Sequence, residues 1–146
     1  MLPFKPADIP SIAYEEAVSE KIRAASQRSK IRDLHDLSEV AGRPINRDLV
    51  RPLAVIKLWE SKKGNLDYAQ FAAQIEGGKD YDLRELENLL RKDQRSDLKT
   101  MISRVKDGFR FLEQMSDLER MLAQDDARRR KAEVEQLKAE AVRRAG

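Results

Sequence analysis

The sequence has 146 residues, of which 38% are charged and 40% hydrophobic, and its formal net charge at pH 7 is +3. This length suits a single domain with a thin core. The lack of cysteine excludes disulfides and thiolate metal sites, and the single histidine leaves no histidine-based zinc site. No apolar run approaches the roughly 20 residues of a membrane span. We therefore expect a cytoplasmic protein that does not enter a membrane.

Helical periodicity runs through most of the chain. Three prolines predict an extended lead-in over residues 1–11. Apolar residues at helical spacing, with glycines as terminators, then predict a series of helices. The predicted helices cover about 12–29, 31–41, 47–62, 67–75 and 83–92, followed by a helical stretch from 96 or 97 to about 124 that Gly108 interrupts.

Residues 125–146 differ in kind from the rest of the chain, because they are dominated by charged side chains. Their apolar seam is limited to Val134, Leu137, Ala141 and Val142, which is too weak for a coiled coil. We expect a charged, partly frayed helical tail behind a helical domain of residues 1–124. The predicted fold class is all-α, a bundle of about six or seven short helices with this tail.

The most informative charges lie in the stretch EKIRAASQRSKIRDLHDL, residues 20–37. Lys21 and Arg28 are seven residues apart and share one face of the first helix. Asp33 and Asp36 are three apart and share one face of the next. Because only a short link separates the helices, these faces can be brought together. The neighbouring apolar stripes predict that some of these charges are partly buried.

Two interpretations of this cluster remain open. In the first it is a phosphate or nucleotide site, because lysine and arginine bind phosphates and a nearby carboxylate can hold a metal ion or accept a proton. In the second it is a network of ion pairs that locks two antiparallel helices. The residues alone favour the second interpretation, because charge networks of this kind are often structural.

The same segment resembles the C-terminal part of the AbiEii/AbiGii-type nucleotidyltransferase toxins, an abortive-infection toxin–antitoxin family. The residues that carry the resemblance are Glu20-Lys21, Arg28, Arg32-Asp33 and Asp36. A later stretch, RFLEQMSDLERMLAQD, residues 110–125, resembles the helical end of that family. The resemblance covers about residues 10–125.

The resemblance implies roles for each of these residues. Lys21 would contact the nucleotide phosphates and Asp33 would be the catalytic carboxylate. Arg28 and Arg32 would also bind the nucleotide phosphates, and Asp36 would support them. A complete enzyme would use Mg²⁺ and an NTP, transfer a nucleotidyl group to an RNA such as tRNA or to a protein, and be paired with an antitoxin protein.

The sequence also departs from the family pattern. A Gly-Ser or Gly-Gly turn followed by an Asp-x-Asp pair should precede Lys21, and the preceding residues contain neither. Gly77-Gly78 and Asp80-Tyr81-Asp82 match the residue types of the glycine turn and the Asp-x-Asp pair. No helix fits between them, however, so we predict a turn and a helix cap there. We therefore expect a truncated or split nucleotidyltransferase, inactive without a companion N-terminal half. The alternative is a non-catalytic helical protein-interaction module.

Other candidates favour structural roles. His35 lacks a nucleophile partner and is expected on a helix face. Trp59, Tyr68 and Phe71 have the helical spacing of core residues rather than of a base-stacking platform. The run Arg128–Lys131 has acidic neighbours and is expected on a solvated face. A basic nucleic-acid-binding module is the weakest alternative, because the positive surplus is divided between the two ends of the chain.

Overall fold

A computed structural model of the chain describes residues 11–77, 81–92 and 97–145. Within these residues all regular structure is helical, so the predicted all-α fold class is confirmed. The elements are α1 (Ser11–Gln27), α2 (Ile31–Ala41), α3 (Arg47–Ser61), α4 (Tyr68–Ile75), α5 (Leu83–Lys92), α6 (Leu98–Gly108), the 3₁₀ turn η1 (Arg110–Glu113), α7 (Asp117–Ala123) and α8 (Lys131–Ala145). Among these described residues, no helix combines the length and apolar character needed to cross a membrane.

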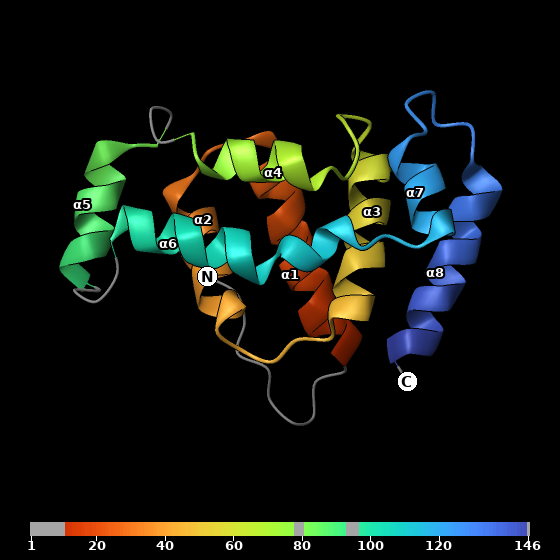
Figure 1. The fold of residues 1–146 in the computed structure, drawn as a ribbon, viewed down its shortest axis with the longest axis horizontal. Helices are drawn as coiled ribbons and strands as arrows, with labels where there is room; N and C mark the ends of the chain where they lie inside the picture. Colours follow the sequence, from red (N-terminus) through yellow and green to blue (C-terminus); the bar gives the residue numbers. More distant parts are fainter. Residues whose placement is uncertain (1–10, 78–80, 93–96, 146) are drawn as a thin grey trace.

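Helix α3 is the central element of the bundle. It packs against α1 on one side and against α7 and α8 on the other, as Figure 1 shows. Between Leu49 and Trp59 every residue except Lys57 is buried. Helix α1 also packs against α2 and α4, and α2 packs against α6. The first two helices, which carry the charge cluster, are therefore fixed by neighbours with large apolar faces.

The apolar positions predicted for the core are buried. Val18 and Ile22 on α1 are fully buried, and Phe71 on α4 packs edge-on against Phe109 at 6.3 Å between ring centroids. At the crossing of α2 and α6, a Cβ atom added to Gly108 would lie 2.6 Å from Ala41 Cβ. This crossing therefore requires glycine at position 108, which also ends α6.

The stretch after Gly108 differs from the continuous helical stripe predicted for it. Phe109 and Leu112 are buried, but they lie in and beside a 3₁₀ turn, and α7 begins only at Asp117. Ser116 starts α7 with a capping box, in which its hydroxyl accepts from the backbone N–H of Glu119. The sequence signal for this break was present in the Ser-x-x-Glu spacing of residues 116–119.

The charged tail forms a helix, as predicted, and one narrow face of it is buried. Val134, Leu137 and Ala141 on α8 are all buried, whereas Val142 is 64% exposed. This burial has a physical reason: α3 presents apolar side chains on the side that faces α8, so a short seam is enough to bury one face of the tail. The proposed domain division at residues 124 and 125 stays a prediction.

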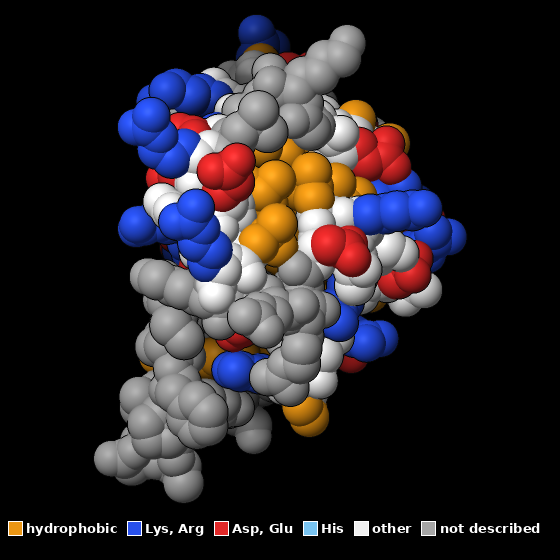
Figure 2. Space-filling view, turned by 90° about the vertical axis from the view of Figure 1, so that its left-hand side faces the viewer, with side chains coloured by type: hydrophobic (Ala, Val, Ile, Leu, Met, Phe, Trp, Pro, Cys, Tyr) orange, Lys and Arg blue, Asp and Glu red, His pale blue; other side chains and the backbone are white. Residues whose placement is uncertain are grey.

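Helix α5 lies at the end of the molecule, beyond α2 and α6 (Figure 1). Its Leu86 and Leu89 are only partly buried, and Figure 2 shows apolar side chains reaching the surface at this end of the molecule. Several predictions lie outside the described residues. They are the lead-in over 1–10, the turn residue Gly78, the carboxylate Asp80 and the helix start at Ser96.

Candidate functional site

The predicted charge cluster forms where α1 and α2 lie side by side. Lys21 projects from α1, and its Nζ atom lies 3.1 Å from Asp33 Oδ1 and 3.1 Å from Asp36 Oδ2, both on α2. Both carboxylates are buried, with 2% of Asp33 and 5% of Asp36 exposed, whereas 23% of the Lys21 side chain is exposed. The expectation that the two charged faces meet and are partly buried is confirmed.

Arg28 adds a second cation to Asp33. Its Nε atom donates to Asp33 Oδ2 at 2.9 Å, and its Nη2 atom lies 3.4 Å from Asp33 Oδ1. Asp33 is therefore held from two sides by Lys21 and Arg28. In contrast with the carboxylate, 54% of the Arg28 side chain is exposed. The Arg28 side chain is therefore partly open to solvent while its guanidinium stays hydrogen-bonded to the buried Asp33.

The two cations remain charged over the physiological pH range. Burial by itself would lower the pKa of Lys21, but its hydrogen bonds to Asp36 and Asp33 outweigh burial and raise that pKa above its usual value. The hydrogen bond and charge of Asp33 raise the pKa of Arg28 as well. Two cations and two carboxylates make a cluster that is neutral as a whole.

Arg32 does not join this cluster. It is exposed, and within the described residues it forms no ion pair. It lines a small cavity of about 130 Å³ between the start of α2 and α5, together with Glu85 and Leu89. The sequence therefore predicted the meeting of Lys21, Arg28 and the two aspartates. Arg32 lies apart from them and has no ion-pair partner among the described residues, and its phosphate-binding role stays a prediction.

Tyr81 is a neighbour of the cluster that the sequence did not indicate. It is 4% exposed, and its hydroxyl donates to the Ile75 carbonyl oxygen at 2.7 Å. Burial, and then the nearby charge of Asp33, raise the pKa of Tyr81 to about 12. The next carboxylate, Asp82, caps α5 by accepting from the backbone N–H groups of Arg84 and Glu85, which confirms the predicted cap.

Of the remaining sequence candidates, the aromatic side chains are confirmed as core residues, since Trp59, Tyr68 and Phe71 are all buried. His35 lies on α2 with its Nε2 atom 3.5 Å from Glu39 Oε1.

The prediction that the basic run lies on a solvated face is wrong for Arg128. The guanidinium of this residue donates to the carbonyl oxygens of Trp59, Gly64 and Asp125 at 2.6–2.8 Å. It joins the end of α3 to the turn before α8. Arg129 and Arg130 are exposed, as the prediction for that run required.

A metal ion does not fit the donor set of this site. Across the part of the chain that the structure describes, His, Asp and Glu side chains nowhere gather in groups of three or more. Asp33 and Asp36, the two carboxylates of the cluster, are instead bridged by the ammonium group of Lys21.

Comparison with known proteins places these observations in a family. The searches of curated proteins and of solved structures give no match. A family model described as "Nucleotidyl transferase AbiEii toxin, Type IV TA system" matches residues 1–140. This match extends beyond the stretch of about 10–125 for which the resemblance was expected, and it includes the whole charge cluster and most of α8. The chain belongs to the AbiEii family of nucleotidyl transferase toxins of type IV toxin–antitoxin systems.

Proposed function

We propose that this chain provides the helical part of a nucleotidyltransferase toxin, and that Lys21 and Arg28 bind the phosphates of the nucleotide. The observation that carries the proposal is the convergence of both cations on one buried carboxylate, Asp33, at distances of 3.1 and 2.9 Å. An ammonium group supplies a compact charge, and a guanidinium supplies a planar fork that matches phosphate oxygens. Both cations are partly exposed, so a phosphate has access to them.

Asp33 is best suited to position these cations. Both of its oxygens accept hydrogen bonds from Lys21 or Arg28, so neither is free to take a proton from an attacking hydroxyl. A catalytic role for Asp33, as the resemblance implies, would require one cation to move onto the phosphate first. We propose that nucleotide binding causes this exchange, with the exposed Arg28 as the cation that moves.

Magnesium, when bound in a nucleotidyltransferase, neutralises phosphate charge and aligns the reacting oxygens. Because Asp33 and Asp36 are engaged by Lys21, we propose that the metal-binding carboxylates come from a segment or companion chain that carries the Gly-Ser and Asp-x-Asp motif. Without that segment the chain binds nucleotide weakly and does not transfer it. Its place in a toxin–antitoxin family also supports an antitoxin as partner.

Nucleotide binding tests the proposal directly. Titration calorimetry with each common NTP, without added metal, should detect binding to the unmodified chain. Arg28→Gln should weaken that binding about tenfold, the effect of one charge-assisted hydrogen bond worth roughly 1.5 kcal/mol. Arg104→Gln is the matched control, because Arg104 is also exposed but lies on α6.

Two results would overturn the proposal. One is the absence of NTP binding, and the other is an equal loss of affinity in Arg28→Gln and Arg104→Gln. A separate label-transfer assay with the chain alone should give no product. Transfer of the label from an NTP would show that the chain needs no outside carboxylates.

The second candidate function is a non-catalytic helical interaction module. The observation in its favour is that Asp33 and Asp36 are buried between α1 and α2 and bridged by Lys21, which is what a helix lock requires. This function predicts that Lys21 and Asp33 matter for stability and that NTPs do not bind. The calorimetry described above therefore separates the two candidates.

A further inference from the structure

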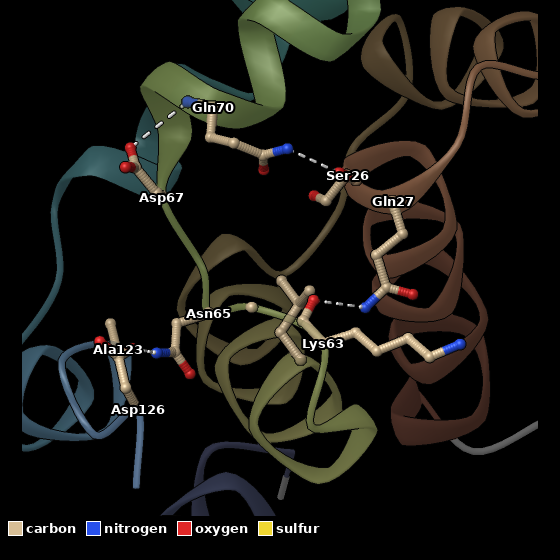
Figure 3. A pocket seen from close by; sticks show the side chains of 10 residues that line it. Ser26, Gln27, Lys63, Asn65, Asp67, Gln70, Ala123 and Asp126 are labelled. Atoms are coloured by element: carbon tan, nitrogen blue, oxygen red, sulfur yellow. Dashed lines mark hydrogen bonds between the residues drawn. The ribbon is translucent and has the colours of Figure 1, made fainter.

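The loop after α3 and the loop between α7 and α8 lie side by side at one end of the molecule, as Figure 1 shows. Arg128 joins them, because its guanidinium donates to the carbonyl oxygens of Trp59 and Gly64, each at 2.6 Å. A second link runs from the amide nitrogen of Asn65 to Asp126 Oδ1, at 2.6 Å (Figure 3). Residues 61 to 69 positions apart in the chain are thus held together by direct hydrogen bonds.

This contact brings two basic segments onto one surface. Five exposed cations lie on the two loops or at the start of α8, and together they form a basic surface: Lys62, Lys63, Arg129, Arg130 and Lys131. Within the described residues four of them form no ion pair, and the fifth, Arg130, has Glu133 Oε1 at 3.5 Å. Positive charges that are far apart in the sequence therefore lie together in the fold with little neutralisation.

Few carboxylates balance this surface. Residues 61–65 and 125–131 together carry six cations and two carboxylates. One of the two carboxylates, Asp125, is 9% exposed and accepts from the backbone N–H groups of Arg129 and Arg130 at 3.1 and 2.9 Å. The acidic neighbours that dilute the basic run in the sequence therefore leave a positive surplus here, and one of them is turned inward.

Lys62 stands at a position that usually takes glycine. It is the C-cap of α3 and has a φ of 59°, in the left-handed region. Its side chain is exposed and forms no hydrogen bond or ion pair with the described residues. The fold itself therefore gives no reason for a lysine here, whereas an anion bound from outside does.

We propose that the basic surface binds the phosphodiester backbone of a nucleic acid, without preference for base sequence. Five exposed cations suit a row of phosphates, and phosphate contacts by themselves carry no sequence information. Trp59 is the nearest aromatic side chain, but it is buried and Arg128 Cζ lies 5.9 Å from its ring centroid, so it cannot stack on a base.

An acidic segment of a protein is the competing partner. Protein partners are usually anchored by buried aromatic or apolar side chains, and residues 61–65 and 125–131 offer no large apolar side chain on this surface. Contacts to a nucleic-acid backbone need only cations and hydrogen-bond donors, which this surface has. The inference does not depend on nucleotide binding by Lys21 and Arg28.

Fluorescence anisotropy with the full chain tests the proposal. The probes are labelled single strands of RNA and DNA with the same mixed sequence of about 20 nucleotides. Both should bind with similar affinity, because the contacts are to the backbone. Five phosphate contacts on a single strand predict that log K falls with log salt concentration at a slope of about −3.5.

Two double variants locate the binding surface, one on each loop. They are Lys62→Gln with Lys63→Gln, and Arg129→Gln with Arg130→Gln. The replaced side chains make at most one exposed ion pair within the described residues, so both variants should fold, as circular dichroism can verify. Each removes two phosphate contacts, which should make the slope shallower by about 1.4 and weaken binding about tenfold at about 100 mM salt.

Lys99→Gln with Arg104→Gln is the matched control, because it removes the same charge from exposed positions on α6, which belongs to neither loop. It should weaken binding less than about twofold. The proposal is overturned if neither strand binds at low salt, or if the loop variants weaken binding no more than the control does. It is also overturned if poly-glutamate at equal charge displaces the probe as well as unlabelled RNA does, since that result assigns the surface to an acidic protein segment.

Discussion

Replacement of Lys21 by methionine tests how strongly the charge cluster stabilises the pairing of α1 and α2. The change keeps most of the apolar stem but leaves Asp33 and Asp36 buried without the ammonium group that bridges them. Removing one partner of a buried ion pair costs about 3–5 kcal/mol. Because 23% of the Lys21 side chain is exposed and Arg28 still holds Asp33, we expect a smaller loss of about 2–3 kcal/mol.

Urea unfolding followed by circular dichroism measures this loss. Lys57→Met is the matched control, because the Lys57 side chain is similarly exposed at 28% but its partner Glu20 lies 4.0 Å away and is 49% exposed. The control should lose less than about 1 kcal/mol. If Lys21→Met costs no more than Lys57→Met, the cluster does not lock the helices and the reasoning fails.

The stability difference between the unmodified chain and Lys21→Met should depend on pH, because the pKa of Lys21 is raised in the folded protein. A group that binds its proton more tightly when folded stabilises the protein fully below its unfolded pKa of 10.5 and loses that contribution as pH rises through the folded pKa. The stability gap between the unmodified chain and Lys21→Met should therefore stay constant from pH 7 to about pH 10 and then narrow.

Three further predictions follow. Gly108→Ala should cost about 1–3 kcal/mol in urea unfolding, because the new Cβ would meet Ala41 at 2.6 Å, and pairing it with Ala41→Gly should recover much of the loss. Leu137→Ala should lower the free energy of unfolding by about 2–4 kcal/mol if α8 is packed as described. An unchanged urea midpoint would show that Leu137 is not buried in solution. Tyr81 should titrate near pH 12 in ultraviolet absorbance, with Tyr81→Phe as the reference, and its raised pKa means that the stability it contributes falls as pH rises from about 10 to 12.

Local signals in the sequence were sufficient where a helix has both a periodic apolar stripe and a strong terminator. Helix α2 has the predicted bounds because Ile31 and Leu34 define its stripe and Gly42 follows its last turn. The same reasoning predicted one continuous helix where the structure has η1 and α7, because the buried residues on both sides of Ser116 keep the spacing of a single apolar stripe. Periodicity reports which side chains are buried, and it does not report a backbone break between them.

The sequence could not show which residues far apart in the chain pack together or form ion pairs. The seam of α8 looked weak because its packing partners lie far away in the chain. Ala141 packs with Leu49 and Leu53 on α3, and Val134 and Leu137 join the main core. For the same reason the buried ion pair of Arg51 with Glu119, at 2.8 Å and separated by 68 residues, had no sequence signal. The charge cluster was predictable because its members lie within two adjacent helices. The phosphate-binding role of Arg32 came from the family resemblance alone and stays a prediction.

The central position of α3 has a consequence for synthesis on the ribosome. Arg51 on α3 can form its ion pair only after Glu119 has been made, 68 residues later. Leu49 and Leu53 can be covered only after α8, which follows α7 in the chain, has been made. Until those residues leave the ribosome, the nascent chain carries an uncovered apolar surface and a charged group without its final partner. Completion of the bundle is therefore a late event, and nascent chains arrested before α8 should be the ones that recruit chaperones or aggregate.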